Sequence, residues 1–341
     1  MRVGTMRSIE RIAGYEDGYG LYAMDVRYRY DLDRLISRGI TDDRSLVEAI
    51  RKEAIPFLPV RMCAPEFSCT AFSMTTADSK HLMGRNYDFK FDTSAMIVRC
   101  RPHGGFSSIA FAALDNIGAN DPMGFGSRIA CLTAPFICLD GVNEKGVSIA
   151  VLTLDSEPTR QKTEGRPTIA TSLVIRLVLD RADSTEAAVN LIRGYAMLAS
   201  SGRDYHFFIT DASGDSRVVE YDCDSPDRAM TVTRVEATTN FYAMHEDRVL
   251  PHQRNGRYGH GRERYDSVMD VIERTRGSAT SEDAWEALRA SSQPPDPEDI
   301  TSNTQWSIVY SNTDLAAEAS IRLHWEDRFG CDLRTGDVTK L

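Results

Sequence analysis

The sequence predicts an α+β fold in which most of the sheet is antiparallel. Strand-like runs come first, paired helices follow, and strands, helices and final strands complete the chain. The strands are short and are separated by polar turns, as expected for hairpin-connected sheets. The helices carry apolar residues along one face, which indicates that each covers a sheet.

The predicted strands begin with a hairpin at 69–89, whose polar turn lies at 77–80. Further strand candidates lie at 94–100, 107–114, 129–141, 145–154, 206–211, 215–222, 231–241 and 307–312. Turn signals such as Asp140-Gly141 and Ser213-Gly214-Asp215 separate several of them.

Four helices are predicted in the second half of the chain. In the segment 167–182, Ile169, Leu173 and Leu177 recur at i, i+4 and i+8 and form one apolar face. Asp183, with Glu186 three residues later, predicts the N-cap of the next helix. The last two helices are expected at 264–275 and 281–292, the second of them capped by Thr280.

Composition excludes several classes of protein. The 341 residues carry 40 Lys plus Arg against 50 Asp plus Glu, and this net charge of −10 argues against non-specific nucleic-acid binding. A chain with 42% hydrophobic and 26% charged residues folds rather than staying disordered. The longest apolar run, 129–139, is far shorter than the roughly 20 residues of a membrane helix. With no secretory signal at its start, the chain is expected to be cytoplasmic.

The seven cysteines do not form a disulfide framework or a zinc ribbon. They are odd in number, widely spread and without CxxC spacing, so most are expected to be buried thiols. The histidines His245, His252 and His260 are interpreted as part of a solvated loop, because no metal-binding pattern accompanies them. The sequence therefore predicts no metal site and no cofactor.

Cys69 could become a self-activated nucleophile if the chain were cut before it. Its thiol and a free α-amine would then share one residue, and an amine that titrates near about 8 can serve as a base. Arg85 and Asp88 follow Cys69 by 16 and 19 residues on the returning strand of the hairpin. The cation could stabilise a thiolate, and the carboxylate could accept hydrogen bonds from the amine.

Two motifs in this region resemble a known family. The segment 69–89 opens with Cys-Thr and carries Gly84-Arg85-Asn86-Tyr87-Asp88, and 140–154 reads Asp-Gly-Val-Asn-Glu-Lys-Gly followed by a strand. Both motifs resemble those of the choloylglycine hydrolases and penicillin V acylases. These enzymes belong to the superfamily that also contains acid ceramidase and N-acylethanolamine acid amidase. The resemblance implies an N-terminal nucleophile hydrolase fold, the four-layer αββα sandwich, and hydrolysis of linear amides through a thioester.

The resemblance also implies roles for single residues. Cys69 would be the nucleophile, Asp88 would orient its liberated amine, and Arg85 would assist the thiolate. Asn240 would lie in the oxyanion hole, with Thr153 as the second contact. Bile-salt hydrolases generally carry Asn at the Thr153 position, so bile-salt specificity is not implied. Arg264 is the best match for a later arginine that closes the site, and Arg262 competes with it.

The 68 residues before Cys69 predict a precursor. Residues 1–68 are expected to be a propeptide or small subunit, and residues 69–341 the catalytic domain. We expect the thiol of Cys69 to attack the carbonyl of Ser68, after which the leader could remain bound. Cys63 is a rival start, but the Ala-Pro-Glu after it makes a poor strand.

Several functions stay open at this level. The acyl group could be a fatty acid, bile acid, phenoxyacetyl or peptide-like group, and an amine could replace water, giving an acyltransferase of the C45 type. A non-catalytic binding module and a Cys/His peptidase are alternatives from other classes. The expected partners are a small N-acyl amide substrate and the cleaved leader. A homo-oligomer is compatible with the sequence, since relatives often form dimers or tetramers.

Overall fold

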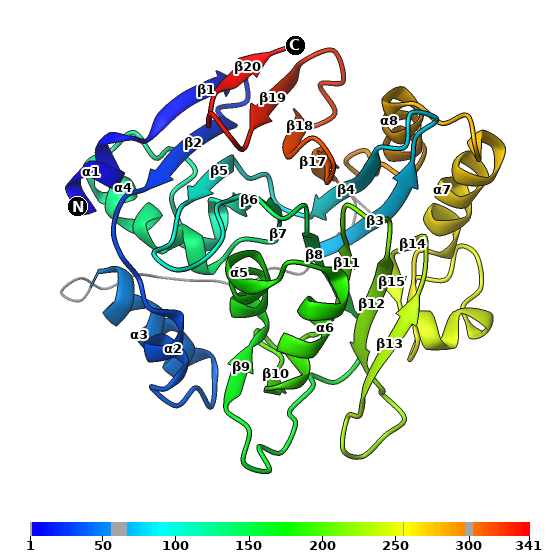
Figure 1. Cartoon of the computed structure of the whole chain (residues 1–341), viewed down its shortest axis with the longest axis horizontal. Coiled ribbons are helices and arrows are strands. Elements are labelled where there is room, and N and C mark those ends of the chain that lie inside the picture. Colours follow the sequence, from blue (N-terminus) through cyan, green and yellow to red (C-terminus); the bar gives the residue numbers. More distant parts are fainter. Residues whose placement is uncertain (1, 56–66, 255, 297–302) are drawn as a thin grey trace.

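The computed structural model describes residues 2–55, 67–254, 256–296 and 303–341. Two antiparallel-rich sheets pack face to face, and helices cover their outer faces (Figure 1). Helices α5 and α6 lie on the first sheet and α7 and α8 on the second. This is the predicted αββα arrangement.

The first sheet has nine strands in the order β1-β2-β5-β6-β7-β8-β11-β12-β13. Its members are β1 (Glu10–Gly14), β2 (Gly20–Val26), β5 (Ala95–Cys100), β6 (Ser108–Ala113), β7 (Asp140–Asn143), β8 (Ser148–Leu154), β11 (Asp204–Thr210), β12 (Ser216–Tyr221) and β13 (Met230–Arg234). The strands β5 to β8 and β11 are buried along almost their whole length, as expected for the middle of a covered sheet.

The second sheet has seven strands in the order β14-β3-β4-β17-β18-β19-β20. They are β14 (Ala237–Thr238), β3 (Phe67–Thr75), β4 (His81–Phe89), β17 (Thr304–Ser311), β18 (Ala316–Ile321), β19 (Arg328–Asp332) and β20 (Val338–Lys340). Two small sheets pair β9 (Thr168–Ala170) with β10 (Ala196–Leu198), and β15 (Asn240–Phe241) with β16 (Gly259–His260).

The four helices predicted in the second half of the chain are confirmed close to their expected positions. The described helices are α1 (Arg2–Arg7), α2 (Leu32–Ile36), α3 (Asp43–Ala54), α4 (Phe125–Ala130), α5 (Thr171–Arg181), α6 (Thr185–Arg193), α7 (Arg262–Thr275) and α8 (Ser281–Ala290), with short 3₁₀ turns at Asp115–Ile117, Cys131–Phe136 and Ala243–Arg248. Thr280 caps α8 as predicted, in a capping box with Asp283. The cap of α6 was placed one residue early, because Ser184 rather than Asp183 accepts the hydrogen bond from Ala187.

The strand predicted at 129–141 is wrong over most of its length. Helix α4 and a 3₁₀ turn occupy 125–136, and only Asp140–Asn143 forms a strand. A continuous apolar run fits a buried helix as well as a buried strand, and Pro135 removes a backbone donor that a central strand would need.

The segment ahead of Cys69 forms part of the main sheet. Strand β2 pairs in parallel with β5, from Leu21 opposite Ala95 to Val26 opposite Cys100. Its apolar side chains are buried, so the leader contributes to the shared core. These contacts involve the described part of the leader. Residues 56–66, and with them the rival start Cys63, lie outside the described residues.

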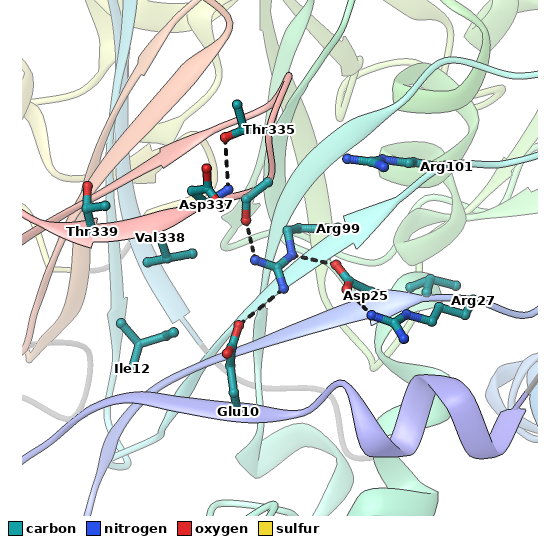
Figure 2. Close-up of a pocket in the computed structure, with 12 residues that line it drawn as sticks. Glu10, Ile12, Asp25, Arg27, Arg99, Arg101, Thr335, Asp337, Val338 and Thr339 are labelled. Carbon is teal, nitrogen blue, oxygen red and sulfur yellow. Dashed lines mark hydrogen bonds and ion pairs between the residues drawn. The ribbon is translucent and has the colours of Figure 1, made fainter.

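Polar contacts also join the leader to the rest of the chain. Arg99 on β5 pairs with Asp25 at 2.7 Å and with Glu10 at 3.3 Å, both from the leader (Figure 2). The same guanidinium donates to the carbonyl of Gly336 near the C-terminus. These residues border a surface cavity of about 630 Å³. One side chain thus ties the leader, the central sheet and the C-terminal hairpin together.

Candidate active site

Cys69 lies in the middle of the fold, inside a strand that continues without a break from Ser68. In the hairpin β3–β4, Ser68 is opposite Asp88 and Cys69 is opposite Tyr87. Ser68 is 1% exposed and Cys69 is fully buried. Because side chains alternate along a strand, the Cys69 thiol faces the core between the sheets, while Asp88 contacts groups beside α7 and α8.

The backbone nitrogen of Cys69 is held by Asn240. It donates a hydrogen bond of 2.7 Å to the side-chain oxygen of Asn240, and both groups are buried. The amide nitrogen of Asn240 donates to Thr153, at 2.9 Å to its carbonyl and 3.2 Å to its hydroxyl. Thr153 therefore fixes which end of the Asn240 amide points at Cys69.

Asn240 reaches this place because the segment predicted as one strand at 231–241 is divided among three sheets. Strand β13 belongs to the nine-stranded sheet, β14 pairs with β3, and β15 pairs with β16. The chain thus crosses from one main sheet to the other just before Asn240. This crossing brings a residue 171 positions away into contact with Cys69.

Arg264 closes the same cluster from the first turn of α7. It donates to the carbonyl of Cys69 at 2.7 Å and to the side-chain oxygen of Asn240 at 2.8 Å, and it lies 3.7 Å from Asp88. Arg262, the competing candidate, instead pairs with Asp266 at 2.7 Å on the outer side of α7. Of the two arginines, the structure brings Arg264 to Cys69.

Arg85 lies beside the thiol and is paired with a second carboxylate, Asp140. Burial raises the pKa of the Cys69 thiol to about 12, and the charge and hydrogen bond of the adjacent Arg85 act in the opposite direction. Arg85 is itself buried, lies 3.4 Å from Asp140 and donates to the carbonyl of Val151. Asp140 was not among the predicted site residues, although it opens the second family-like motif.

Asp88 is a buried carboxylate with several donors. Thr304 donates to it at 2.6 Å and Gln293 at 2.8 Å. Burial raises the pKa of Asp88, while Arg264 and these two donors oppose the rise. Thr304 and Gln293 were not predicted, because the pairing of β17 with β4 brings Thr304 here and hydrogen bonds with Thr304 hold Gln293 beside it.

Gly84 explains why the motif before Arg85 begins with glycine. Gly84 lies opposite Phe72 across the hairpin, and a Cβ atom at this position would be 2.1 Å from the Phe72 ring. No side chain fits in that space without moving the ring. The glycine therefore allows the Phe72 ring to pack against β4 on the helix-covered face of the hairpin, opposite to the face that carries Cys69.

A histidine that was interpreted as solvated belongs to this site. The side chain of His260 is only 12% exposed; its Nε2 lies 3.2 Å from the hydroxyl of Ser68, and its Nδ1 lies 2.6 Å from Asp155. His245 is also buried, whereas His252 is exposed as expected. The interpretation of a solvated loop is therefore wrong for His260 and His245. The tertiary fold alone places His260 beside Ser68.

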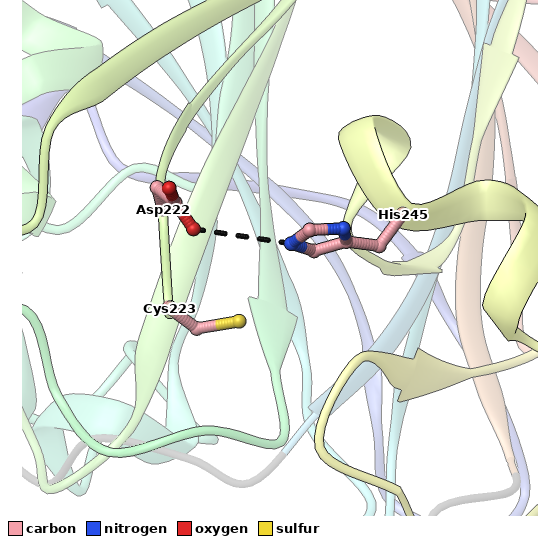
Figure 3. Close-up of side chains that lie close together, drawn as sticks. All are labelled: Asp222, Cys223 and His245. Carbon is pink, nitrogen blue, oxygen red and sulfur yellow. Dashed lines mark ion pairs between the residues drawn. The ribbon is translucent and has the colours of Figure 1, made fainter. Parts of the chain in front are cut away.

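Three potential metal ligands gather elsewhere, at the end of β12 and in the turn after β15. The ligand atoms of Asp222, Cys223 and His245 lie within 4.8 Å of one another (Figure 3). The neighbouring Asp224 is paired with Arg257. None of these three residues contributes to the cluster around Cys69.

The remaining described cysteines are free thiols, and all but Cys223 are buried. In the described residues, no helix combines the length and apolar character needed to cross a membrane.

The comparisons with known proteins agree with this architecture. A family model described as linear amide C-N hydrolases, choloylglycine hydrolase family, matches residues 69–237. The match begins at Cys69 and includes the hairpin, the Asp140 motif and Thr153. This part of the chain therefore resembles a family described as hydrolases of linear amide C-N bonds.

Solved structures with the same fold include two named hydrolases. Penicillin V acylase from Agrobacterium tumefaciens is 19% identical, with a TM-score of 0.56, over 80% of this chain and 91% of its own. Two variants of conjugated bile acid hydrolase from Clostridium perfringens are 14% identical, with TM-scores of 0.57 and 0.58, over 80% of this chain and 96% of theirs. At these identities the likeness establishes the N-terminal nucleophile hydrolase fold.

Proposed function

We propose that this protein hydrolyses linear N-acyl amides with Cys69 as its nucleophile, and that cleavage of its own Ser68–Cys69 bond produces the active form. The observation that carries the proposal is the hydrogen bond from the Cys69 nitrogen to Asn240. It joins the first residue of the family match to a positioned amide, next to Arg85. In the intact chain this nitrogen belongs to a peptide bond and cannot act as a base.

The proposed activation is an attack of Cys69 on the residue before it. The thiol sulfur forms a bond to the carbonyl carbon of Ser68, and the bond from that carbon to the Cys69 nitrogen breaks as the nitrogen takes up a proton. The product is a thioester with a free amine. Water then attacks the thioester, which leaves a carboxylate on Ser68 and restores the thiol of Cys69.

The liberated amine would serve as the base in the mature enzyme. It takes the thiol proton while the sulfur attacks the substrate carbonyl, and it returns the proton to the leaving amine. Water then hydrolyses the acyl thioester by the same route. Arg85 stabilises the thiolate, Asp88 orients the amine, and the Asn240 amide with Thr153 stabilises the oxyanion. Arg264 offsets the buried charge of Asp88.

The proposed substrate is a small molecule in which an acyl group is joined to an amine. Sites of this kind bury an apolar arm of the substrate, so we expect an apolar acyl group. No metal or organic cofactor takes part in the proposed steps. Since β2 is built into the main sheet, we propose that residues 1–68 remain bound as a small subunit after cleavage.

The first experiment is an intact-mass measurement of the wild type beside Cys69→Ala under denaturing conditions. The proposal expects the wild type to separate into pieces of 68 and 273 residues, while the variant stays whole. The cleaved protein should then hydrolyse members of a panel of N-acyl amides. A wild-type chain that stays whole and inactive at neutral and mildly acidic pH would contradict the proposal.

A further inference from the structure

A series of hydrogen bonds runs from the side chain of Ser68 through His260 to Asp155. The hydroxyl of Ser68 lies 3.2 Å from Nε2 of His260, and Nδ1 of the same ring lies 2.6 Å from Asp155. Ser68 is 1% exposed, and the His260 and Asp155 side chains are 12% and 23% exposed. The proposed mechanism uses neither His260 nor Asp155.

The chemistry of the three groups fixes the direction of these hydrogen bonds. A carboxylate only accepts, so Nδ1 of His260 donates its proton to Asp155. In the tautomer that carries its proton on Nδ1, Nε2 has the lone pair and accepts the proton of the Ser68 hydroxyl. Asp155 is held in turn by Arg203, 3.3 Å from its other oxygen. Each member of the series therefore orients the next.

The same elements that hold Asn240 also build this series of hydrogen bonds. His260 is the cross-strand partner of Asn240 in the β15–β16 ladder. Asp155 follows Thr153, the partner of the Asn240 amide, by two residues. Asn240 contacts the nitrogen side of the Ser68–Cys69 bond, and His260 contacts the acyl side.

We infer that His260 and Asp155 form a positioning pair that recognises the hydroxyl of Ser68 and fixes the acyl half of the scissile bond for attack. This inference rests on the proposed self-cleavage. When the Cys69 sulfur bonds to the Ser68 carbonyl carbon and the carbon–nitrogen bond breaks, the proton goes to the Cys69 nitrogen. His260 keeps its hydrogen bonds throughout and is not consumed. Its role is to anchor the side chain of Ser68 and thereby restrict the backbone of that residue, so that the carbonyl stays in reach of the thiol.

The test follows cleavage of newly synthesised full-length chains by intact mass against time. Ser68→Ala and His260→Asn should each slow cleavage by about tenfold, the size expected for one buried hydrogen bond. His260→Gln should retain most of the rate, because a glutamine amide can lie where Nε2 lies and meet the Ser68 hydroxyl. An asparagine amide corresponds to Nδ1 and reaches only Asp155. His252→Asn, an exposed histidine of the same segment, is the matched control and should cleave at the wild-type rate.

The double variant Ser68→Ala/His260→Asn separates positioning from a general structural role. If His260 acts through Ser68, the double variant cleaves no more slowly than Ser68→Ala alone. Additive losses, or wild-type rates in both single variants, would overturn the inference while leaving self-cleavage intact. A wild type that never cleaves would overturn this inference together with the proposed function.

Discussion

The amide oxygen of Asn240 accepts a hydrogen bond from the backbone nitrogen of Cys69, and Arg264 donates to the same oxygen. An asparagine predicted to stabilise an oxyanion thus has its oxygen directed at the nitrogen of the scissile bond, while its amide nitrogen is bound to Thr153. In the intact chain, Asn240 is therefore arranged to hold the Ser68–Cys69 peptide. Cleavage would convert its partner from an amide nitrogen into an amine.

Replacing Asn240 tests this arrangement. Asn240→Ala removes the hydrogen bonds of Asn240 with the Cys69 nitrogen and with Thr153, and we expect slower cleavage together with amide hydrolysis reduced about 10²- to 10³-fold. Asn240→Asp is the matched variant, because it keeps the acceptor toward Cys69 but loses the donor toward Thr153. Intact mass and substrate turnover are measured on both. Equal activity of Asn240→Ala and wild type would remove Asn240 from the mechanism.

The two arginines at the start of α7 provide a paired comparison. Arg264→Met should lower the free energy of unfolding by about 3–5 kcal/mol, because it leaves the buried Asp88 without its cation. It should also abolish detectable cleavage. Arg262→Met removes a partly exposed pair with Asp266 and should cost less than about 1 kcal/mol. Chemical denaturation measures both. The assignment of Arg264 fails if the two variants behave alike.

The rate of self-cleavage should increase with pH. Because burial raises the pKa of the Cys69 thiol to about 12, the neutral thiol predominates at pH 6 to 9. The thiolate fraction then increases about tenfold for each pH unit below the pKa, and the rate should follow. Denatured chain is refolded by dilution into buffers across this pH range, and the cleavage rate of the refolded chain is measured. A rate that falls as pH rises would show that the thiolate is not the attacking group.

The two pieces produced by cleavage should stay together. Strand β2 of the leader is buried against β5, and Arg99 binds Asp25 and Glu10 of the leader. We expect the 68-residue piece to co-elute with the 273-residue piece in native size exclusion and to separate only in denaturant. Loss of the small piece under native conditions would contradict the small-subunit proposal.

Gly84→Ala should destabilise the hairpin that carries the site. The added Cβ would lie 2.1 Å from the Phe72 ring, so the ring or the strand must move, at a cost of about 1–3 kcal/mol. Gly126→Ala, in α4 with open space around the added Cβ and no positive φ, separates this steric effect from the general effect of replacing a glycine. Thermal unfolding of both variants in the Cys69→Ala background measures the difference. Comparable losses would exclude the close contact as the cause.

The sequence patterns were sufficient for the α+β class and for the residues of the hairpin, and the family resemblance supplied the αββα arrangement. Strand periodicity and the short connection between β3 and β4 already place Arg85 and Asp88 near Cys69, because such local pairing depends on sequence spacing alone. The helices and the Thr280 cap follow from equally local rules. The strand predicted from the apolar run at 129–141 was wrong, because such a run indicates burial in the core but does not distinguish a strand from a helix.

Tertiary structure decided everything that depends on long-range pairing. The crossing of the chain between the two sheets brings Asn240 to Cys69, and the pairing of β17 with β4 supplies Thr304 to Asp88. The sequence indicated that His260 belongs to a solvated polar loop. In the structure, the pairing of β15 with β16 places His260 beside Ser68. Residues 1–68 were expected to be a propeptide or small subunit, and only the tertiary structure shows that backbone hydrogen bonds hold β2 in the main sheet. Contacts of this kind depend on which strands become neighbours, and no local pattern in the sequence specifies that.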